Sequence, residues 1–259
     1  MADRSRRRHA VIAGLTLVGA IAIAIAFWPA RQTAPRASAG VASTTTTPSA
    51  STSTTDTTGS TTSTVATSST TPDPPPYRSS ISTVTTEMLG ASYTPGLGCT
   101  EPGELRAIDL VHWGYDGAVH EGRIIVAATE ADAVAAIFSD LYDARFPIER
   151  IEPIDRYGAD DQASMRANNT SGYNCRTVAG TSTLSNHARG KAIDVNPLHN
   201  PYVKRGSIDP PEGEPWADRT DPRPGMIFDA DAVVMAFAAR SWSWGGYWTS
   251  GQDYQHFDT

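Results

Sequence analysis

A low-complexity segment limits where this 259-residue chain can build a folded core. From Gln32 to about Tyr77 the chain consists almost wholly of Thr, Ser, Ala and Pro. Such side chains offer too little apolar surface to offset the entropy lost on ordering. We therefore expect a disordered, extended tether over residues 31–78, which could also carry O-linked sugars. Residues 79–259 should form the folded domain, because that length supports a hydrophobic core without help from a metal or disulfides.

An apolar run before the tether has the features of a transmembrane helix. Residues 1–9 form a basic tail that contains Arg4, Arg6, Arg7 and Arg8. Residues 10–30 follow, and their uncharged part of about 19 residues nearly spans a hydrocarbon core. The arginines favour the cytoplasmic side, so we expect a single-pass cell-membrane protein with its domain outside the cytoplasm. The alternative is a signal cleaved near Ala37-Ser38-Ala39, which would give a secreted protein.

Net charge and cysteine count restrict the classes of partner and of metal site. The formal net charge of −7 disfavours binding to a polyanion, so we expect no nucleic-acid partner. Two cysteines, Cys99 and Cys175, are too few for a thiolate-rich structural zinc site. In an exported domain they either form a disulfide or stay two separate buried thiols. We expect the domain to be a monomer.

Hydrophobic patterning predicts an α+β fold, a small antiparallel sheet with flanking helices. Alternating apolar residues predict strands at Leu105–His112 and Gly122–Ala128, joined as a hairpin. Shorter strands are expected at 151–154 and 192–195, and a closing hairpin at 244–257.

Two segments have helical spacing. Apolar residues between 133 and 141 predict one helix, with Thr129 as its N-cap. A second helix is expected over 233–238, capped by Asp229 or Asp231.

Residues from two parts of the domain have the side chains of a catalytic zinc site. Such a site needs three protein ligands and one open position, and imidazole and carboxylate groups suit zinc. His187 and Asp194 are separated by a turn in which Gly190 lets the backbone fold back. His256 would complete the ligand set from the far end of the chain. The alternative set is His187, Asp194 and His199, with His256 outside it.

A peptidase also needs a base that is not a metal ligand. Asp253 lies three residues before His256, close enough to reach the open coordination position. The peptide carbonyl becomes an oxyanion in the transition state, and Arg176 is our candidate for its positive partner.

Two further residues are candidates for substrate contacts, Ser185 and Trp244. Ser185 as a nucleophile is excluded, because His187 cannot bind zinc and also act as its base. We expect Ser185 to form hydrogen bonds near the metal ligands instead. For Trp244, as for Trp242 and Trp248, packing in the core is the alternative to lining a cleft.

Three motifs resemble those of a known zinc peptidase family. SNHARGKAID, at 185–194, matches the pattern S-x-H-x-x-G-x-A-x-D, DYQHF at 253–257 matches D/E-x-x-H, and WGGYW at 244–248 also fits. They resemble the VanY-type D-alanyl-D-alanine carboxypeptidases and their endopeptidase relatives. SMRANNTSGYNCR at 164–176 is similar to one branch of that family, and the likeness covers most of 90–259.

The resemblance implies one Zn²⁺ held by His187, Asp194 and His256, with Asp253 as general acid and base. Arg176 stands where the family has a substrate-polarising arginine. The substrates implied are peptidoglycan stem peptides. The base is Asp here and Glu in other branches, which shortens its reach by one methylene group.

Other functions compete with a D-alanyl-D-alanine carboxypeptidase. An endopeptidase would cut within the stem peptide, and a catalytically silent module of the same fold would only bind the cell wall. A complete ligand set together with Asp253 argues against the silent module. A zinc amidase that cuts the glycan–peptide bond would need a base element with different spacing.

Overall fold

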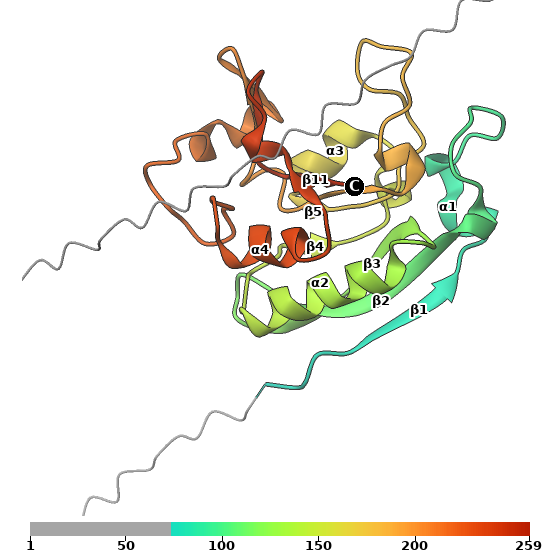
Figure 1. Cartoon of the computed structure of the whole chain (residues 1–259), viewed down its shortest axis with the longest axis horizontal. Helices are drawn as coiled ribbons and strands as arrows, with labels where there is room; N and C mark the ends of the chain where they lie inside the picture. The colour runs from blue at the N-terminus through green and yellow to red at the C-terminus, as the bar shows by residue number, and fades with distance from the viewer. Residues whose placement is uncertain (1–73) are drawn as a thin grey trace, which may run out of the picture. The chain divides into compact units, whose positions relative to one another are not determined.

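The computed structural model describes residues 74–259, which form a mixed α and β fold with small antiparallel sheets and few helices (Figure 1). No helix within these residues is long and apolar enough to cross a membrane. The predicted transmembrane helix at 10–30 and most of the predicted tether lie outside the described residues. Tyr77 already belongs to the fold, because its hydroxyl donates to Ala135 O at 3.0 Å.

The sheet with the longest strands has three antiparallel strands in the order β1–β2–β3. They are β1 Ser79–Thr83, β2 Leu105–Trp113 and β3 Val119–Ala127. The β2–β3 hairpin confirms the pattern-based prediction. On one face Ile108 and Ile124 are cross-strand partners in the core, and the next pair, Asp109 and Arg123, forms an ion pair on the other face. The alternation of buried and charged positions fixes the register of the sheet.

Helix α2, Ala131–Asp143, packs against β2 and confirms the first predicted helix (Figure 1). Its apolar side meets the core with Ala131, Val134, Ile137, Phe138, Leu141 and Tyr142. Thr129 was the wrong cap, because the N-cap position is Glu130 and the Thr129 hydroxyl donates to the Glu130 carboxylate.

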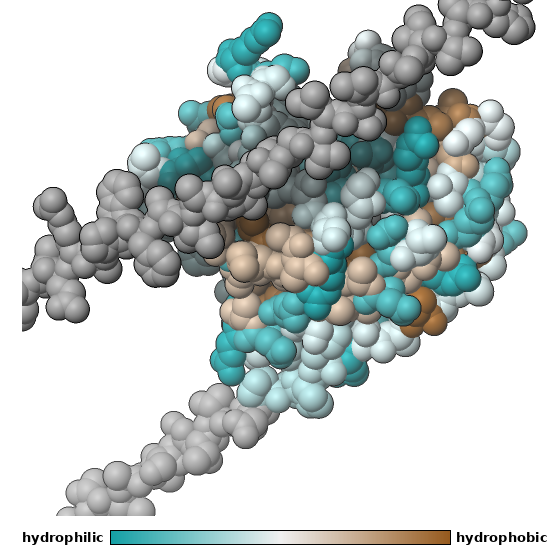
Figure 2. Space-filling view, in the orientation of Figure 1, coloured by the Kyte–Doolittle hydropathy of each residue, from teal (hydrophilic) through white to brown (hydrophobic). Residues whose placement is uncertain are grey.

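Helix α4, Ala232–Ala238, packs beside α2 and confirms the second predicted helix. Of its two candidate caps, Asp231 accepts a hydrogen bond from Val234 N at 2.9 Å, as an N-cap does. Asp229 instead accepts from the Tyr247 hydroxyl at 2.5 Å. The outer faces of α2 and α4 carry several alanines, and Figure 2 shows a tan, weakly hydrophobic surface over them.

The rest of the described chain builds short strands in separate sheets, so the predicted single sheet is wrong in this part. One sheet has the order β6–β11–β9 and another the order β10–β7–β8, both antiparallel, and β4 pairs with β5 in parallel. Their bounds are β4 Arg150–Ile151, β5 Asn169–Thr170, β6 Ala192–Asp194, β7 Tyr202–Lys204, β8 Ser207–Asp209, β9 Ser243–Trp244, β10 Gln252–Asp253 and β11 His256–Asp258. The segment predicted as a closing hairpin is divided, because β9 and β11 pair with each other and β10 pairs with β7. The strand predicted at 151–154 ends at Ile151, because Pro153 follows and a turn begins at Ile154.

Two further short helices and six 3₁₀ turns lie between the strands of residues 74–259. The helices are α1 Thr86–Leu89 and α3 Asp161–Arg166. The turns are Gly90–Ser92, Pro102–Glu104, Ile154–Tyr157, His187–Arg189, Pro211–Trp216 and Gly245–Tyr247. The core joins β6, β9 and β11 to α4 by aromatic packing, in which Phe237 stacks on Phe257 with ring centroids 3.9 Å apart.

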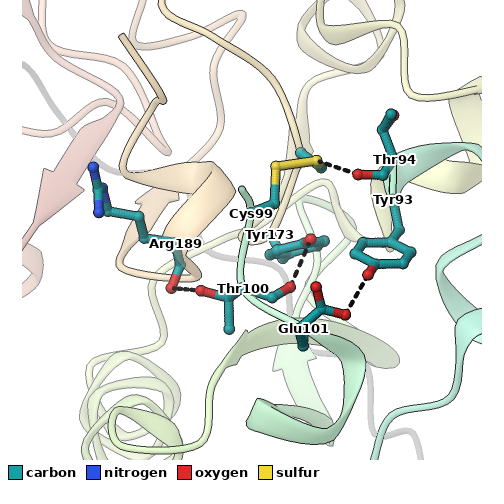
Figure 3. The surroundings of a disulfide bond; sticks show 8 residues. Tyr93, Thr94, Cys99, Thr100, Glu101, Tyr173 and Arg189 are labelled. Atoms are coloured by element: carbon teal, nitrogen blue, oxygen red, sulfur yellow. Dashed lines mark hydrogen bonds between the residues drawn. A yellow bond between two sulfur atoms is a disulfide. The ribbon is translucent and has the colours of Figure 1, made fainter. Parts of the chain in front are cut away.

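Cys99 and Cys175 form a disulfide, which decides between the two alternatives for these residues (Figure 3). Thr100, the residue after Cys99, adds two hydrogen bonds between the same parts of the chain. The Thr100 carbonyl accepts from the Tyr173 hydroxyl at 3.0 Å, and the Thr100 hydroxyl donates to Arg189 O at 3.1 Å (Figure 3). The disulfide and Thr100 together fasten the segment that follows β5 and the turn His187–Arg189 to the N-terminal part of the fold.

Candidate metal centre

Three side chains that are far apart in sequence converge on one point: His187, Asp194 and His256. Each offers a ligand atom, and these atoms all lie within 4.8 Å of one another. His187 Nε2 lies 3.2 Å from one Asp194 carboxylate oxygen, and His256 Nδ1 lies 3.0 Å from the other. Two imidazoles and one carboxylate are a donor set that suits a single zinc ion and leaves a coordination position open. The predicted ligands thus form a group that could hold one metal ion.

The turn His187–Arg189 places the first ligand. It ends at Gly190, whose φ of 67° lies in the left-handed region. A Cβ at Gly190 would also stand 2.4 Å from the backbone nitrogen of Ala127 in β3, too close for any side chain. Glycine is therefore required twice over, for the reversal and for the approach to the large sheet. This agrees with the predicted role of Gly190.

Strand pairing places the other two ligands. In the antiparallel pair of β6 and β11, His256 and Asp194 are direct cross-strand partners, and Phe257 is the partner of Ile193. Neighbouring residues of a strand point to opposite faces. Phe257 and Ile193 therefore enter the core, and both are fully buried, while His256 and Asp194 share the other face. The convergence of two ligands from distant parts of the chain follows from this register.

Each ligand histidine is held through its second ring nitrogen. His187 Nδ1 lies 2.7 Å from Gly172 O, a carbonyl that can only accept. His256 Nε2 lies 3.4 Å from the Asp258 carboxylate, which also accepts from Asn186 Nδ2 at 2.9 Å. These contacts orient both rings and leave the nitrogen nearest Asp194 as the one available to a metal.

The electrostatics of the centre favour a positive charge. Burial lowers the pKa of His256, but its hydrogen bonds to Asp194 and Asp258 outweigh burial and raise the pKa to about 10. Burial would raise the pKa of Asp194, but His187 and His256 hold it well below its usual range. Burial likewise opposes ionisation of Asp258, and hydrogen bonds from His256 and Asn186 lower its pKa nonetheless. A divalent cation would supply the positive charge that this arrangement attracts.

Asp253 lies beside the ligands without joining them. It is in β10, opposite Tyr202 in β7. Its Oδ1 atom is buried and finds no hydrogen-bond partner among the described residues. Burial, together with the charges of Asp194 and Asp209, raises the pKa of Asp253 to about 7 against the lowering effects of His256 and Gln255. A carboxyl group whose pKa lies near neutrality suits proton transfer in both directions.

The fold brings Asp253 close to the ligands through Gly245. A Cβ at that position would stand 2.7 Å from Asp253 O and 3.3 Å from His256 Cβ. The glycine therefore lets the turn Gly245–Tyr247 lie directly against the base and the third ligand. This is a physical reason for the glycine in the WGGYW motif.

The three ligands and Asp253 line a cleft of about 440 Å³. Arg176 and Ser185 line it too, so both candidates reach the site. Arg176 pairs with Asp161 of α3, at 2.8 Å between Nη2 and the carboxylate. The Ser185 hydroxyl accepts a hydrogen bond from His187 N at 3.2 Å, so it supports the turn that carries the first ligand.

Trp244 does not lie in this cleft, so its proposed substrate contact needs correction. It is only 5% exposed, and its indole donates to Tyr254 O at 2.9 Å. Trp248, and not Trp244, lies where a substrate contact was expected. Trp248 is 38% exposed, lines the cleft and stands 5.3 Å from the His256 ring, centroid to centroid.

The alternative ligand His199 lies elsewhere. Its Nδ1 is 2.6 Å from the Tyr115 hydroxyl, and its ring stacks on Trp216 with centroids 4.4 Å apart. Burial lowers its pKa to about 4. The structure does not group His199 with His187 and Asp194, and its contacts are those of a half-buried packing residue.

Comparison with known proteins agrees with this geometry. Residues 179–259 match the D-alanyl-D-alanine carboxypeptidase family. The match confirms the family resemblance of the motifs, and it contains all three candidate ligands and Asp253. At the level of the family it supports a metallopeptidase of the D-alanyl-D-alanine carboxypeptidase type. No curated protein and no solved structure matches the chain.

Sequence reasoning missed the groups that support the ligands. Asp258 had a signal, because it lies two residues after His256 and same-face residues of a strand are two apart. Gly172 contributes only a backbone carbonyl, which no residue pattern marks. Gln255 lies within the DYQHF motif and lines the cleft, but neither its neighbours nor its polarity indicated that it would be buried.

Proposed function

We propose that this chain is a zinc-dependent peptidase that hydrolyses peptidoglycan stem peptides, with D-alanyl-D-alanine carboxypeptidase activity as the first candidate. The observation that carries the proposal is the convergence of His187, Asp194 and His256 beside the buried, unpartnered carboxylate oxygen of Asp253. The family match of residues 179–259 supports the same reaction class.

Each residue has a role that follows from its place. A zinc ion at the three ligands would supply Lewis acidity, which activates water and polarises the scissile carbonyl. Asp253 takes a proton from the attacking water and delivers it to the leaving amine nitrogen. Arg176 faces the same cleft and places positive charge near the carbonyl oxygen, where negative charge develops in the transition state.

Cleavage within the stem peptide is the second candidate, and one observation favours it. A carboxypeptidase must recognise the terminal carboxylate of its substrate, which calls for a cation. In the described part of the chain, Arg176 is the one arginine or lysine that lines the cleft, and it is paired with Asp161. An endopeptidase needs no free cation at this position.

The proposed setting is the bacterial cell envelope. Under this proposal residues 10–30 hold the protein in the cell membrane, and residues 31–78 let the domain reach the wall from outside the cytoplasm. The basic tail, the apolar run and the Ser/Thr/Pro composition support this arrangement.

A cleavage assay tests the proposal. The purified full-length chain is incubated with defined muropeptides, with and without a metal chelator, and the fragments are weighed by mass spectrometry. Loss of one terminal alanine indicates a carboxypeptidase, and fragments from an internal bond indicate an endopeptidase. Chelation should abolish either activity, and added zinc should restore it. If no muropeptide is cut in a chelator-sensitive way, the enzyme proposal fails and a wall-binding module is favoured.

A further inference from the structure

Gln255 is a buried polar side chain in the cleft that the proposed mechanism does not use. Its exposure is only 3%. In the sequence it lies between Asp253 and the candidate ligand His256. Its Oε1 atom is fully buried and has no hydrogen-bond partner among residues 74–259. A buried amide oxygen without a partner is costly, so a native structure needs a reason to retain one.

The surroundings of Gln255 define which of its atoms is free. The backbone is fixed, because Gln255 O accepts from Val195 N at 2.9 Å. The side chain acts on Asp253, because its amide NH₂ group, the only donor in the side chain, lowers the pKa of that carboxyl. The carbonyl end of the amide therefore remains as an unpartnered acceptor, and Gln255 lines the cleft together with Asp253, whose Oδ1 also has no partner among residues 74–259.

The charge of the cleft restricts what can satisfy this acceptor. Besides Asp194 and Asp253, the lining includes the carboxylates of Asp161, Asp209 and Asp258, and the opposing positive charges are those of Arg176 and His256. A carboxylate ligand has no proton to donate and would be repelled by these carboxylates. A neutral N–H group can donate and meets no repulsion. In a peptidase cleft the N–H group that must come next to the proton donor belongs to the scissile amide.

We propose that Gln255 is a substrate-positioning residue whose Oε1 accepts a hydrogen bond from the N–H of the scissile amide. The inference rests on the proposed peptidase function and deepens it. The hydrogen bond would hold the leaving nitrogen beside Asp253, so that the nitrogen lone pair faces the carboxyl group that protonates it. The site would then require an N–H at the scissile bond and discriminate against an ester oxygen there.

The step balances without a chemical change in Gln255. The water oxygen bonds to the carbonyl carbon, one water proton passes to Asp253, and the carbon–nitrogen bond breaks as that proton passes to nitrogen. Gln255 accepts the same hydrogen bond before and after and neither gains nor loses a proton. Its contribution is orientation, whose loss lowers the rate for amides alone.

The first experiment compares matched peptides that carry either an amide or an ester at the cleaved bond. Gln255→Met removes the acceptor at equal length, and Gln252→Met makes the same change at a neighbouring residue of β10 that does not line the cleft. Loss of one neutral hydrogen bond should lower kcat/KM for the amide about tenfold in Gln255→Met. The ester rate should stay within about twofold, and Gln252→Met should match the wild type on both. An equal fall for amide and ester would overturn the proposal, because Gln255 would then act on the attacking water or on the fold. An unchanged amide rate would also overturn it.

The second experiment needs no turnover and separates this inference from the proposed function. The zinc-loaded wild-type chain is titrated calorimetrically with a phosphonamidate and a phosphonate analogue of the terminal D-alanyl-D-alanine bond, which differ only in N–H against O. If fragments show internal cleavage, analogues of that bond are used. The phosphonamidate should bind about tenfold more tightly, and Gln255→Met should remove the preference. That preference without any muropeptide cleavage would leave the role of Gln255 standing while the proposed function fails. Equal binding, or no binding of either analogue, by the wild type would overturn the role of Gln255.

Discussion

Two regions of the domain are stabilised in different ways. The sheet region, residues 79–143, contains strands of nine residues and a helix of 13 residues around an apolar core. In the site region, residues 185–259, the strands have two or three residues each, and 3₁₀ turns connect them. Side-chain hydrogen bonds to the backbone take the place of long strand ladders there. At Asn200 the amide nitrogen lies within hydrogen-bond distance of three backbone carbonyls, and the amide oxygen accepts from Ile227 N. The difference suggests that burial of apolar surface holds the first region, and that a few polar contacts set the geometry of the second.

The largest effect is expected in the site region. His187→Ala removes a metal ligand, so we expect loss of bound zinc and activity that falls to the level seen with a chelator. The sheet region does not depend on this residue, so the circular dichroism spectrum should stay close to that of the wild type. Zinc content, measured by atomic absorption, checks the first point.

The matched control is Asp253→Asn, which keeps all three ligands and removes the base. We expect zinc to be retained and kcat to fall by about 10²–10⁴-fold. Full zinc content in His187→Ala would contradict the ligand assignment.

Next in size is a change in the core of the sheet region. Phe138→Ala leaves a cavity at a position in α2 that is 1% exposed. The free energy of unfolding should therefore fall by about 3–5 kcal/mol. Zinc affinity of the protein that remains folded should change by less than about twofold, because additivity holds for distant sites. Urea titration and zinc titration measure the two quantities. A large loss of zinc affinity would remove the distinction between the regions.

A smaller effect is expected where a support of the ligands is altered. Asp258→Asn keeps the shape of the side chain and removes the charge that faces His256 Nε2, so zinc affinity should fall by about 10–100-fold. Competition with a coloured chelator measures the affinity. The free energy of unfolding without zinc should change little in comparison, and an unaltered zinc affinity would show that Asp258 does not orient His256.

The smallest effect is expected at Asn200, a fully buried side chain of the site region. Asn200→Ala leaves the Val195 and Gly225 carbonyls and Ile227 N short of a partner, which should cost about 1–3 kcal/mol of stability. Because Val195 follows Asp194, zinc affinity should fall as well, unlike in Phe138→Ala. Thermal unfolding with and without zinc detects both changes. Loss of stability at constant zinc affinity would mean that the polar contacts do not set the site geometry.

The same two regions differ in how well the sequence predicts them. Strands β2 and β3 and helix α2 were predicted because nine and 13 residues of regular spacing outweigh local exceptions. The candidate metal ligands were predicted from their chemistry and from the resemblance of two motifs to a zinc peptidase family, without knowledge of the strands that carry them. The two-residue strand β10 could not be predicted, because its pairing with β7 depends on tertiary structure alone.

Trp244 and Trp248 show the limit most clearly. They are four residues apart in one motif and have the same side chain, so periodicity alone does not decide which one is buried. The 3₁₀ turn Gly245–Tyr247 between them sends Trp244 into the core and Trp248 to the cleft. Whether Cys99 and Cys175 form a disulfide could not be predicted for a similar reason, because the distance between them depends on the complete fold.

The pairing of β6 with β11 makes packing and chemistry inseparable in this protein. If β11 shifted by one residue, Phe257 would face the cleft and His256 would point into the hydrophobic core. A metal ion that bridges both strands would oppose such a slip, because only one alignment brings its donors together. The ion would thus select the correct alignment of the two strands. Protein refolded in the presence of zinc should therefore contain fewer misaligned molecules than protein that receives zinc afterwards.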